Sequence, residues 1–209
     1  MPSLFICKNR LTLHDGSRKF DTRKLTWVPL NAPAAESETV TPAEAVRWLN
    51  TEANARMVPV GVIGPREATD QQAAVAEQLG RQLGSLGITL LNGGKNGVME
   101  AVSKGCAEAG GMVLGFVPED DWRTANDYVT IPIATGIGKA RNVLIAQSSL
   151  ALVAVGGGYG TMSEMAFGLH FDKPVFTLCG APELDGAQQM DSVDEVMESL
   201  MAVILQLSE

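Results

Sequence analysis

The sequence predicts an α/β fold built on a doubly wound parallel sheet, preceded by a small N-terminal β-hairpin and helix extension. Two observations lead to this prediction. From Val58 onward, short apolar runs alternate with longer amphipathic segments, a pattern typical of parallel strands joined by helices. Glycines follow three of the apolar runs, at Gly64, Gly93-Gly94 and Gly156-Gly157-Gly158. Because parallel strands end at one edge of their sheet, these glycines are expected to lie together, where such sheets bind ligands.

The first part of the chain differs in pattern from the rest. We assign residues 1–56 to the N-terminal extension and residues 57–209 to the main domain. Residues 1–27 alternate apolar and polar side chains around a turn signal at Asp15 and Gly16. This pattern predicts a hairpin or a small antiparallel sheet.

The extension is expected to end in a short helix. Residues 29–44 have the composition of a loop, and the helix signal lies at its end. Thr41, Pro42 and Glu44 have the spacing of an N-cap, a first-turn proline and the third residue of a capping box. The helix that they predict ends near Asn54.

Strands and helices alternate through the main domain. The run 59–64 is apolar, as a strand covered on both faces should be, and segment 70–87 places its apolar residues on one helical stripe. Ser192 and Glu195 have the spacing of a capping box that opens the last helix. Strands are expected at 59–64, 88–94, 112–118, 129–135, 150–158 and 174–180. Helices are expected at 70–87, 97–111 and 138–149, after Gly158, and from Ser192 to Leu207.

Composition and charge exclude several function classes. The chain has 209 residues, of which 45% are hydrophobic, and a net charge of −8. That balance disfavours nucleic acid as a partner, because there is no basic excess to replace the counterions of its backbone. No apolar run approaches the length of a membrane span, so no membrane partner is expected.

The cysteines and the first residues of the chain point to the cytoplasm. Cys7, Cys106 and Cys179 lie far apart and have no spacing that suits a metal, so no metal site is expected. They are expected to be buried thiols in a reducing compartment, and no signal-peptide core precedes them. We therefore expect a cytoplasmic protein.

The stretch GGGYGT (156–161) has the composition of a phosphate-binding loop. Glycine lets the backbone approach a ligand closely, and the helix that follows presents unpaired N–H groups at its positive end. A second loop, NGGKNG (92–97), follows another strand in the same way. The alternative is a pair of tight turns that hold no ligand. The candidate phosphate-binding residues are Gly64, Gly93, Gly94, Gly97, Gly157, Gly158, Gly160 and Thr161.

Several common motifs are missing from these loops. The first strand continues into GPREATD, which is not a dinucleotide fingerprint, and no GK[ST] follows either glycine loop. No GxSxG elbow is present, so Ser163 is a poor candidate for a nucleophile. His170 lies on an otherwise apolar helical segment and is expected to be structural.

Glu164 and Arg141 are the candidate catalytic residues. Glu164 follows the glycine loop by about one helical turn, where the helix dipole is expected to lower the pKa of its carboxyl group. The alternative role for Glu164 is to stabilise its own helix. Arg141 lies near the start of another helix, an electrostatically unfavourable place unless it binds a phosphate or Glu164. Lys139 and Asn142 are neighbours that could share this work.

Two stretches, NGGKNGVMEAVSKG and VGGGYGTMSE, resemble the LOG family of cytokinin-activating phosphoribohydrolases. The run from Gly61 to Cys179 is more similar still to a bacterial branch related to the DNA-processing protein DprA and to molybdenum cofactor carrier proteins. The resemblance covers about residues 58–180. It implies a Rossmann-like fold, a homodimer or higher homo-oligomer, and a site for a nucleoside monophosphate.

The resemblance also implies roles for individual residues. In the LOG enzymes, the Glu of GGxGTxxE and an Arg one helix earlier form the catalytic pair, and these positions are Glu164 and Arg141 here. The surroundings differ, because Val155 replaces the family's proline. Lys139 and Asn142 replace the His and the Lys that flank the arginine. A lysine decarboxylase has no support, because no lysine stands in the context of a pyridoxal-phosphate site.

Three functions remain open from the sequence. The first is an enzyme that hydrolyses a nucleoside 5′-monophosphate to base and ribose 5-phosphate, with no required cofactor. The second is a non-catalytic protein that binds or carries a nucleotide or the molybdenum cofactor, whose pterin bears a phosphate. The third is an oligomeric scaffold whose N-terminal extension recruits a partner or caps the neighbouring site. A small-molecule nucleotide is the expected ligand in the first and a possible ligand in the second.

Overall fold

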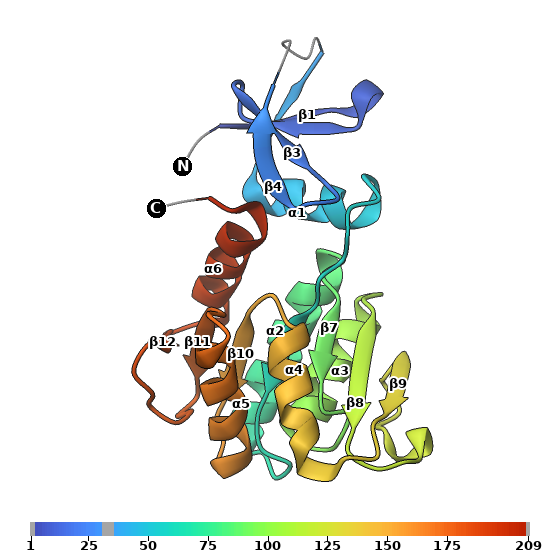
Figure 1. The fold of residues 1–209 in the computed structure, drawn as a ribbon, viewed down its shortest axis with the longest axis vertical. Helices are drawn as coiled ribbons and strands as arrows, with labels where there is room; N and C mark the ends of the chain where they lie inside the picture. The colour runs from blue at the N-terminus through green and yellow to red at the C-terminus, as the bar shows by residue number, and fades with distance from the viewer. Residues whose placement is uncertain (1–2, 31–35, 208–209) are drawn as a thin grey trace. The chain divides into compact units, whose positions relative to one another are not determined.

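The computed structural model describes residues 3–30 and 36–207, which fall into two compact units. One unit is Val58–Met197, and the other combines Met1–Met57 with Glu198–Glu209. Each unit is described by itself below, and Figure 1 shows the course of the chain. No helix within the described residues is long and apolar enough to cross a membrane.

A seven-stranded sheet forms the centre of Val58–Met197 (Figure 1). Its strand order is β12-β11-β10-β6-β7-β8-β9, and every neighbouring pair runs parallel. This confirms the predicted α/β class with a doubly wound parallel sheet. The strands are β6 (Val60–Ile63), β7 (Leu90–Asn92), β8 (Val113–Val117), β9 (Ile131–Ala134), β10 (Leu152–Val155), β11 (Val175–Leu178) and β12 (Gln188–Gln189).

The strand order reverses between β6 and β10. The chain enters the sheet at β6, adds β7, β8 and β9 on one side, and then adds β10, β11 and β12 on the other. In open parallel sheets, ligands bind outside the carboxyl ends of the strands at such a reversal. Gly64 directly follows β6 and Gly156 directly follows β10, so both glycines lie at this point.

Helices cover both faces of the sheet, with α2 and α3 on one face and α4 and α5 on the other (Figure 1). Residues 138–149, expected as one helix, form a 3₁₀ turn before α4, and Gly138 at the start of this turn takes a positive φ of 59°. The two-residue strand β12 was not predicted from the sequence. The helices are α2 (Asp70–Ser85), α3 (Val98–Glu108), η2 (Trp122–Thr124), η3 (Gly138–Arg141), α4 (Asn142–Ser148), α5 (Tyr159–His170) and α6 (Val193–Leu205).

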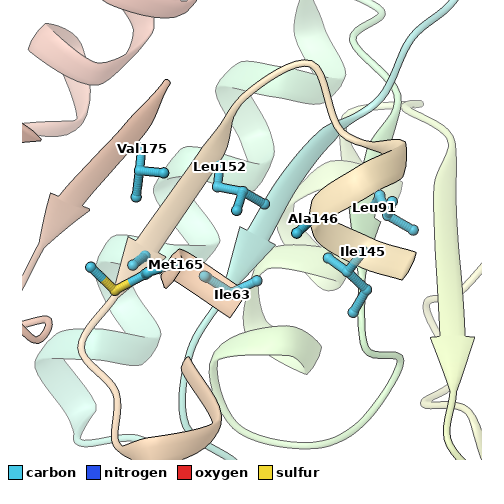
Figure 2. Packing of buried hydrophobic residues seen from close by; sticks show 8 residues of the cluster. Ile63, Leu91, Ile145, Ala146, Leu152, Met165 and Val175 are labelled. Carbon is cyan, nitrogen blue, oxygen red and sulfur yellow. The ribbon is translucent and has the colours of Figure 1, made fainter. Parts of the chain in front are cut away.

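An apolar cluster joins α4 and α5 to the sheet, and Figure 2 shows most of its side chains. Ile145 of α4 and Met165 of α5 are fully buried against strand residues that point to this face. This packing fixes α5, which carries Glu164, and α4, which directly follows Arg141. The buried members are Ile63, Leu91, Ile145, Ala146, Leu152, Ala154, Met165 and Val175.

The other unit contains a five-stranded antiparallel sheet in the order β4-β3-β2-β1-β5. Of the two predicted forms, a hairpin or a small antiparallel sheet, the structure has the sheet, and β5 adds a strand from the segment expected as a loop. The Asp15-Gly16 turn joins β2 to β3 as expected. The elements are β1 (Leu4–Cys7), η1 (Lys8–Arg10), β2 (Thr12–His14), β3 (Arg18–Asp21), β4 (Thr26–Pro29), β5 (Glu38–Val40) and α1 (Pro42–Thr51).

The segment expected as a loop, residues 29–44, contains two of these elements. β5 and the start of α1 both lie within it, while residues 31–35 lie outside the described part of the chain. The predicted capping box is present. Thr41 Oγ1 accepts a hydrogen bond from the Glu44 amide at 3.2 Å, and Glu44 Oε2 accepts one from the Thr41 amide at 2.7 Å.

Candidate functional site

A cavity of about 610 Å³ opens at the point where the strand order reverses. Its walls come from the loop after β6, the turn before α4 and the first turns of α5. A volume of this size is within the range of sites for small ligands. The lining residues are Gly64, Pro65, Arg66, Met99, Pro118, Lys139, Arg141, Asn142, Gly158, Tyr159, Gly160, Thr161, Ser163 and Glu164.

The cavity brings together some of the residues singled out in the sequence and leaves others outside. Of the ten candidates, six line it: Gly64, Arg141, Gly158, Gly160, Thr161 and Glu164. Gly93, Gly94, Gly97 and Gly157 do not line it. The glycine loop after β10 therefore lines the cavity, and the loop after β7 does not.

The loop NGGKNG (92–97) contacts Arg141 without lining the cavity. Its polar backbone groups bond inside the protein, since Gly94 N donates to Asn92 Oδ1 at 2.8 Å and Gly94 O accepts from the Asn126 amide at 2.8 Å. Gly93 lies against Arg141, and a Cβ there would stand 2.0 Å from the guanidinium. The carbonyl of Gly93 accepts a long hydrogen bond of 3.5 Å from Arg141 Nη2.

Gly97 holds the loop after β6 in place. A Cβ on Gly97 would lie 2.5 Å from the carbonyl oxygens of both Pro65 and Arg66, so only glycine permits this close approach. The amide of Val98 donates to the Pro65 carbonyl at 3.1 Å. The backbone of Arg66 is therefore fixed at the edge of the cavity.

The glycine loop after β10 leads directly into α5. Gly158 is the N-cap of α5, no side chain caps the helix, and its first turn contains no acidic residue. Gly157, with φ of 141°, lets the loop pack against Thr161, because a Cβ there would lie 2.5 Å from the Thr161 Cβ. The uncapped end of a twelve-residue helix thus faces the cavity with its positive dipole end.

Arg141 and Glu164 form a buried ion pair in the cavity wall. Arg141 Nη1 lies 2.9 Å from Glu164 Oε1, and both residues are only 6% exposed. Burial raises the pKa of Glu164 to about 7, against the opposing effect of the Arg141 charge. The lowered pKa expected from the helix dipole is therefore wrong. The carboxyl group is removed from water, and that loss outweighs the electrostatic help available to it.

Asn142 connects this pair to the glycine loop. Its Oδ1 accepts a hydrogen bond of 2.8 Å from Arg141 Nη1, and its Nδ2 donates to Ser163 Oγ at 3.0 Å. Ser163 Oγ in turn donates to the Gly160 carbonyl at 2.7 Å. The Ser163 hydroxyl thus uses its hydrogen bonds to connect Asn142 to the first turn of α5.

One buried polar atom in the site is unpaired. The Nε of Arg141 makes no hydrogen bond within the described residues, although the atom is buried. A buried donor without a partner is costly, and binding a ligand can supply the acceptor. Arg141 therefore has one donor that its protein contacts do not use.

Sequence reasoning overlooked Arg66. It follows Gly64 and Pro65 at the carboxyl end of β6, the same kind of position that drew attention to the glycines. The available signal was a charged residue three positions after the end of β6.

Comparison with known families identifies the fold and the family. The SLOG cluster4 family, LDcluster4, matches residues 57–205, which is well over half of the chain. The chain belongs to the SLOG cluster4 family. An uncharacterized protein of Archaeoglobus fulgidus is 39% identical to this SLOG cluster4 protein over 142 residues, which cover 68% of this chain and 93% of the relative.

The SLOG cluster4 protein is also similar to plant enzymes of the LOG family. The probable cytokinin riboside 5′-monophosphate phosphoribohydrolase LOGL5 of Oryza sativa subsp. japonica is 37% identical over 103 residues. The matched part covers 48% of this chain and 41% of that enzyme. The chain spans about half the length of the plant relatives that it matches.

Solved structures agree with this assignment. The molybdenum cofactor binding protein from Rippkaea orientalis superposes with a TM-score of 0.67 at 34% identity, covering 71% of this chain and 98% of that chain. DprA from Streptococcus pneumoniae shares the fold alone, with a TM-score of 0.56 at 18% identity over 68% of this chain and 61% of that one. The Rossmann-like fold and the resemblance to LOG, carrier and DprA proteins are confirmed.

Proposed function

We propose that this SLOG cluster4 protein is a phosphoribohydrolase that converts a nucleoside 5′-monophosphate and water into free base and ribose 5-phosphate. The observation that carries the proposal is the buried Arg141–Glu164 pair, which lines a cavity beside the uncapped N-terminus of α5. The similarity to plant phosphoribohydrolases over this part of the chain supports it. Release of free base from nucleoside monophosphates tests it.

The phosphate is placed at the N-terminus of α5. Backbone N–H groups of Gly158, Gly160 and Thr161 are available there, and the helix dipole favours an anion. Gly64, at the end of β6, also lines the cavity, and it must be glycine for packing, because a side chain in its place would strike Val98 and the Val155 carbonyl. Gly157 and the loop with Gly93, Gly94 and Gly97 shape the site without lining it.

Replacing Thr161 by Ala is expected to weaken phosphate binding by about 1–2 kcal/mol, the scale of a lost hydrogen bond to a charged group. Thr161 lines the cavity, and its hydroxyl makes no hydrogen bond within the described part of the chain, so it is free to donate. Isothermal titration with ribose 5-phosphate measures the change. An unchanged affinity would move the phosphate away from this helix end.

Glu164 and Arg141 would act on the bond between the ribose and the base. In N-glycosidic hydrolysis, water adds to C1′ while the C1′–N bond breaks and the base leaves with the bonding electrons and gains a proton. An ionised Glu164 can take the proton of the water or stabilise the positive charge that develops on the sugar. Arg141 orients the carboxylate through their ion pair.

The rate is expected to depend on the ionisation of Glu164. Both roles need the carboxylate, and its pKa of about 7 means that this form increases as the pH rises through neutrality. We therefore expect kcat/KM for base release to rise from about pH 6 to about pH 8 around a midpoint of about 7 and then to level off. Initial rates across buffers of constant ionic strength measure this. A profile that falls over the same range would make Glu164 a general acid instead.

A non-catalytic carrier is the alternative, favoured by the likeness to the molybdenum cofactor binding protein. The same phosphate site would serve the phosphate of a pterin cofactor. Tyr159, 92% exposed at the cavity, offers a ring on which a base or a pterin could stack, so it fits both ligands. Binding without base release from any nucleotide would favour the carrier.

We also propose a homodimer or higher homo-oligomer, as the resemblance implies. Ile131 and Ile133 of the edge strand β9 are 42% and 38% exposed. They pair in register with Leu114 and Phe116, so all four side chains lie on the face of the sheet that carries α4 and α5. A second copy of the chain would cover this apolar strip. A cytoplasmic location and independence from any cofactor remain predictions.

A further inference from the structure

Two cations besides Arg141 line the cavity. Arg66 comes from the loop after β6, and Lys139 comes from the 3₁₀ turn that precedes α4. Both side chains are exposed, and neither makes an ion pair or a hydrogen bond with any part of the chain that the structure describes. They are therefore available to a ligand, and the mechanism above does not use them.

The residues that line the cavity carry more positive than negative charge. Three cations, Arg66, Lys139 and Arg141, line the cavity with one carboxylate, Glu164, and that carboxylate is paired with Arg141. Burial lowers the pKa of Arg141 and the charge of Glu164 raises it, while the charges of Arg66 and Glu119 act on it in opposite directions. In a chain with a net charge of −8, this local positive excess calls for an anion from outside.

Hydrogen bonds and close packing fix the backbone at or next to both cations. The Pro65–Arg66 segment is held by Gly97 and by the Val98 amide, as described above. The turn that carries Lys139 is tied to the loop after β8, because the Gly138 amide donates to the Pro118 carbonyl at 2.9 Å. Fixed attachment points reduce the entropy lost when the side chains close on a ligand.

We propose that Arg66 and Lys139 bind the phosphate group of the ligand together with the N-terminus of α5, so that the site takes phosphomonoesters and rejects their dephosphorylated forms. A phosphomonoester carries between one and two negative charges at neutral pH, whereas a helix end supplies about half a positive charge. The two side chains supply the remainder. The proposal rests on the proposed function for the nucleotide nature of the ligand and for the placement of its phosphate at the N-terminus of α5.

Binding of ribose 5-phosphate and of ribose, followed by isothermal titration of the full chain, tests this proposal. Arg66→Ala and Lys139→Ala are each expected to weaken ribose 5-phosphate binding by about tenfold or more, without changing the weak binding of ribose. The matched control is Lys173→Ala, which removes the same charge from a residue that does not line the cavity. Added salt should weaken binding more in the wild type than in the variants.

The outcomes separate this proposal from the proposed function. If both variants bind ribose 5-phosphate as tightly as the control, or if the wild type does not bind it, the phosphate role of Arg66 and Lys139 is overturned. If the variants lose binding while the wild type releases no base from any nucleotide, the phosphate role stands and the hydrolase fails. If base release continues with unchanged KM in both variants, the hydrolase stands and the phosphate role fails.

Discussion

Replacing Glu164 by Gln is expected to reduce base release from nucleoside 5′-monophosphates by about 10³-fold or more, while nucleotide affinity stays within about threefold of the wild type. The amide side chain introduced by Glu164→Gln keeps the size and most of the packing of the buried carboxyl side chain. It lacks the negative charge that either catalytic role needs. Single-turnover rates and direct binding measurements separate the two effects.

Glu100→Gln is the matched control for this experiment. Glu100 lies in the first turn of α3, another helix that follows a glycine loop, but it does not line the cavity. If Glu164 had only a structural role, Glu164→Gln would lower stability because it leaves buried Arg141 without its partner, whereas Glu100→Gln would cost little, and both variants would keep full activity. Retained base release in Glu164→Gln would remove the catalytic role of this residue.

Replacing Arg141 by Met is expected to lower the free energy of unfolding by about 3–5 kcal/mol, because it leaves a buried carboxyl group without its partner. Both side chains of the pair are more than nine-tenths buried, so the loss should far exceed that of a surface ion pair. The pKa of Glu164 would rise further, and base release at neutral pH would fall with it.

Urea unfolding of Arg141→Met, Glu164→Gln and the double variant measures this coupling. The double variant removes both charges, so it should be more stable than the sum of the two single losses predicts. A loss below about 1 kcal/mol in Arg141→Met would mean that water reaches the pair, as it does for exposed pairs. The buried geometry would then not describe the protein in solution.

The sequence alone was enough to predict that Gly64 and the loop after β10 lie close together at one edge of the sheet. It follows from two regularities, that parallel strands end at one edge and that ligands bind where strand order reverses. Arg141 and Glu164 were singled out for the same reason, and the structure places them 2.9 Å apart. The chemistry of each residue type and its predicted position at this edge of the sheet were enough to make both residues candidates.

Burial and loop contacts could not be predicted in this way. The raised pKa of Glu164 depends on how α4 and α5 pack around it, which no local pattern encodes. The two glycine loops have similar sequences, yet the first is bonded to the segment around Asn126 and does not line the cavity, whereas the second does. Asn126 lies far along the chain from the first loop, so no local pattern reveals this contact.

Asn142 shows how a departure from the LOG pattern becomes part of the site. Where the resemblance leads one to expect a lysine, Asn142 accepts from Arg141 and donates to Ser163. A lysine cannot accept a hydrogen bond, so this link between the arginine and α5 requires the amide. The altered surroundings of the candidate catalytic pair therefore have a structural role of their own.

A base-release assay tests the central claim most directly. The purified full chain is incubated with a panel of nucleoside 5′-monophosphates, and free base and ribose 5-phosphate are separated by chromatography, with Glu164→Gln in parallel. The account predicts equimolar base and ribose 5-phosphate from at least one nucleotide, and neither product from the variant. Nucleotide binding without release of base from any member of the panel would contradict it and leave the cavity a binding or carrier site.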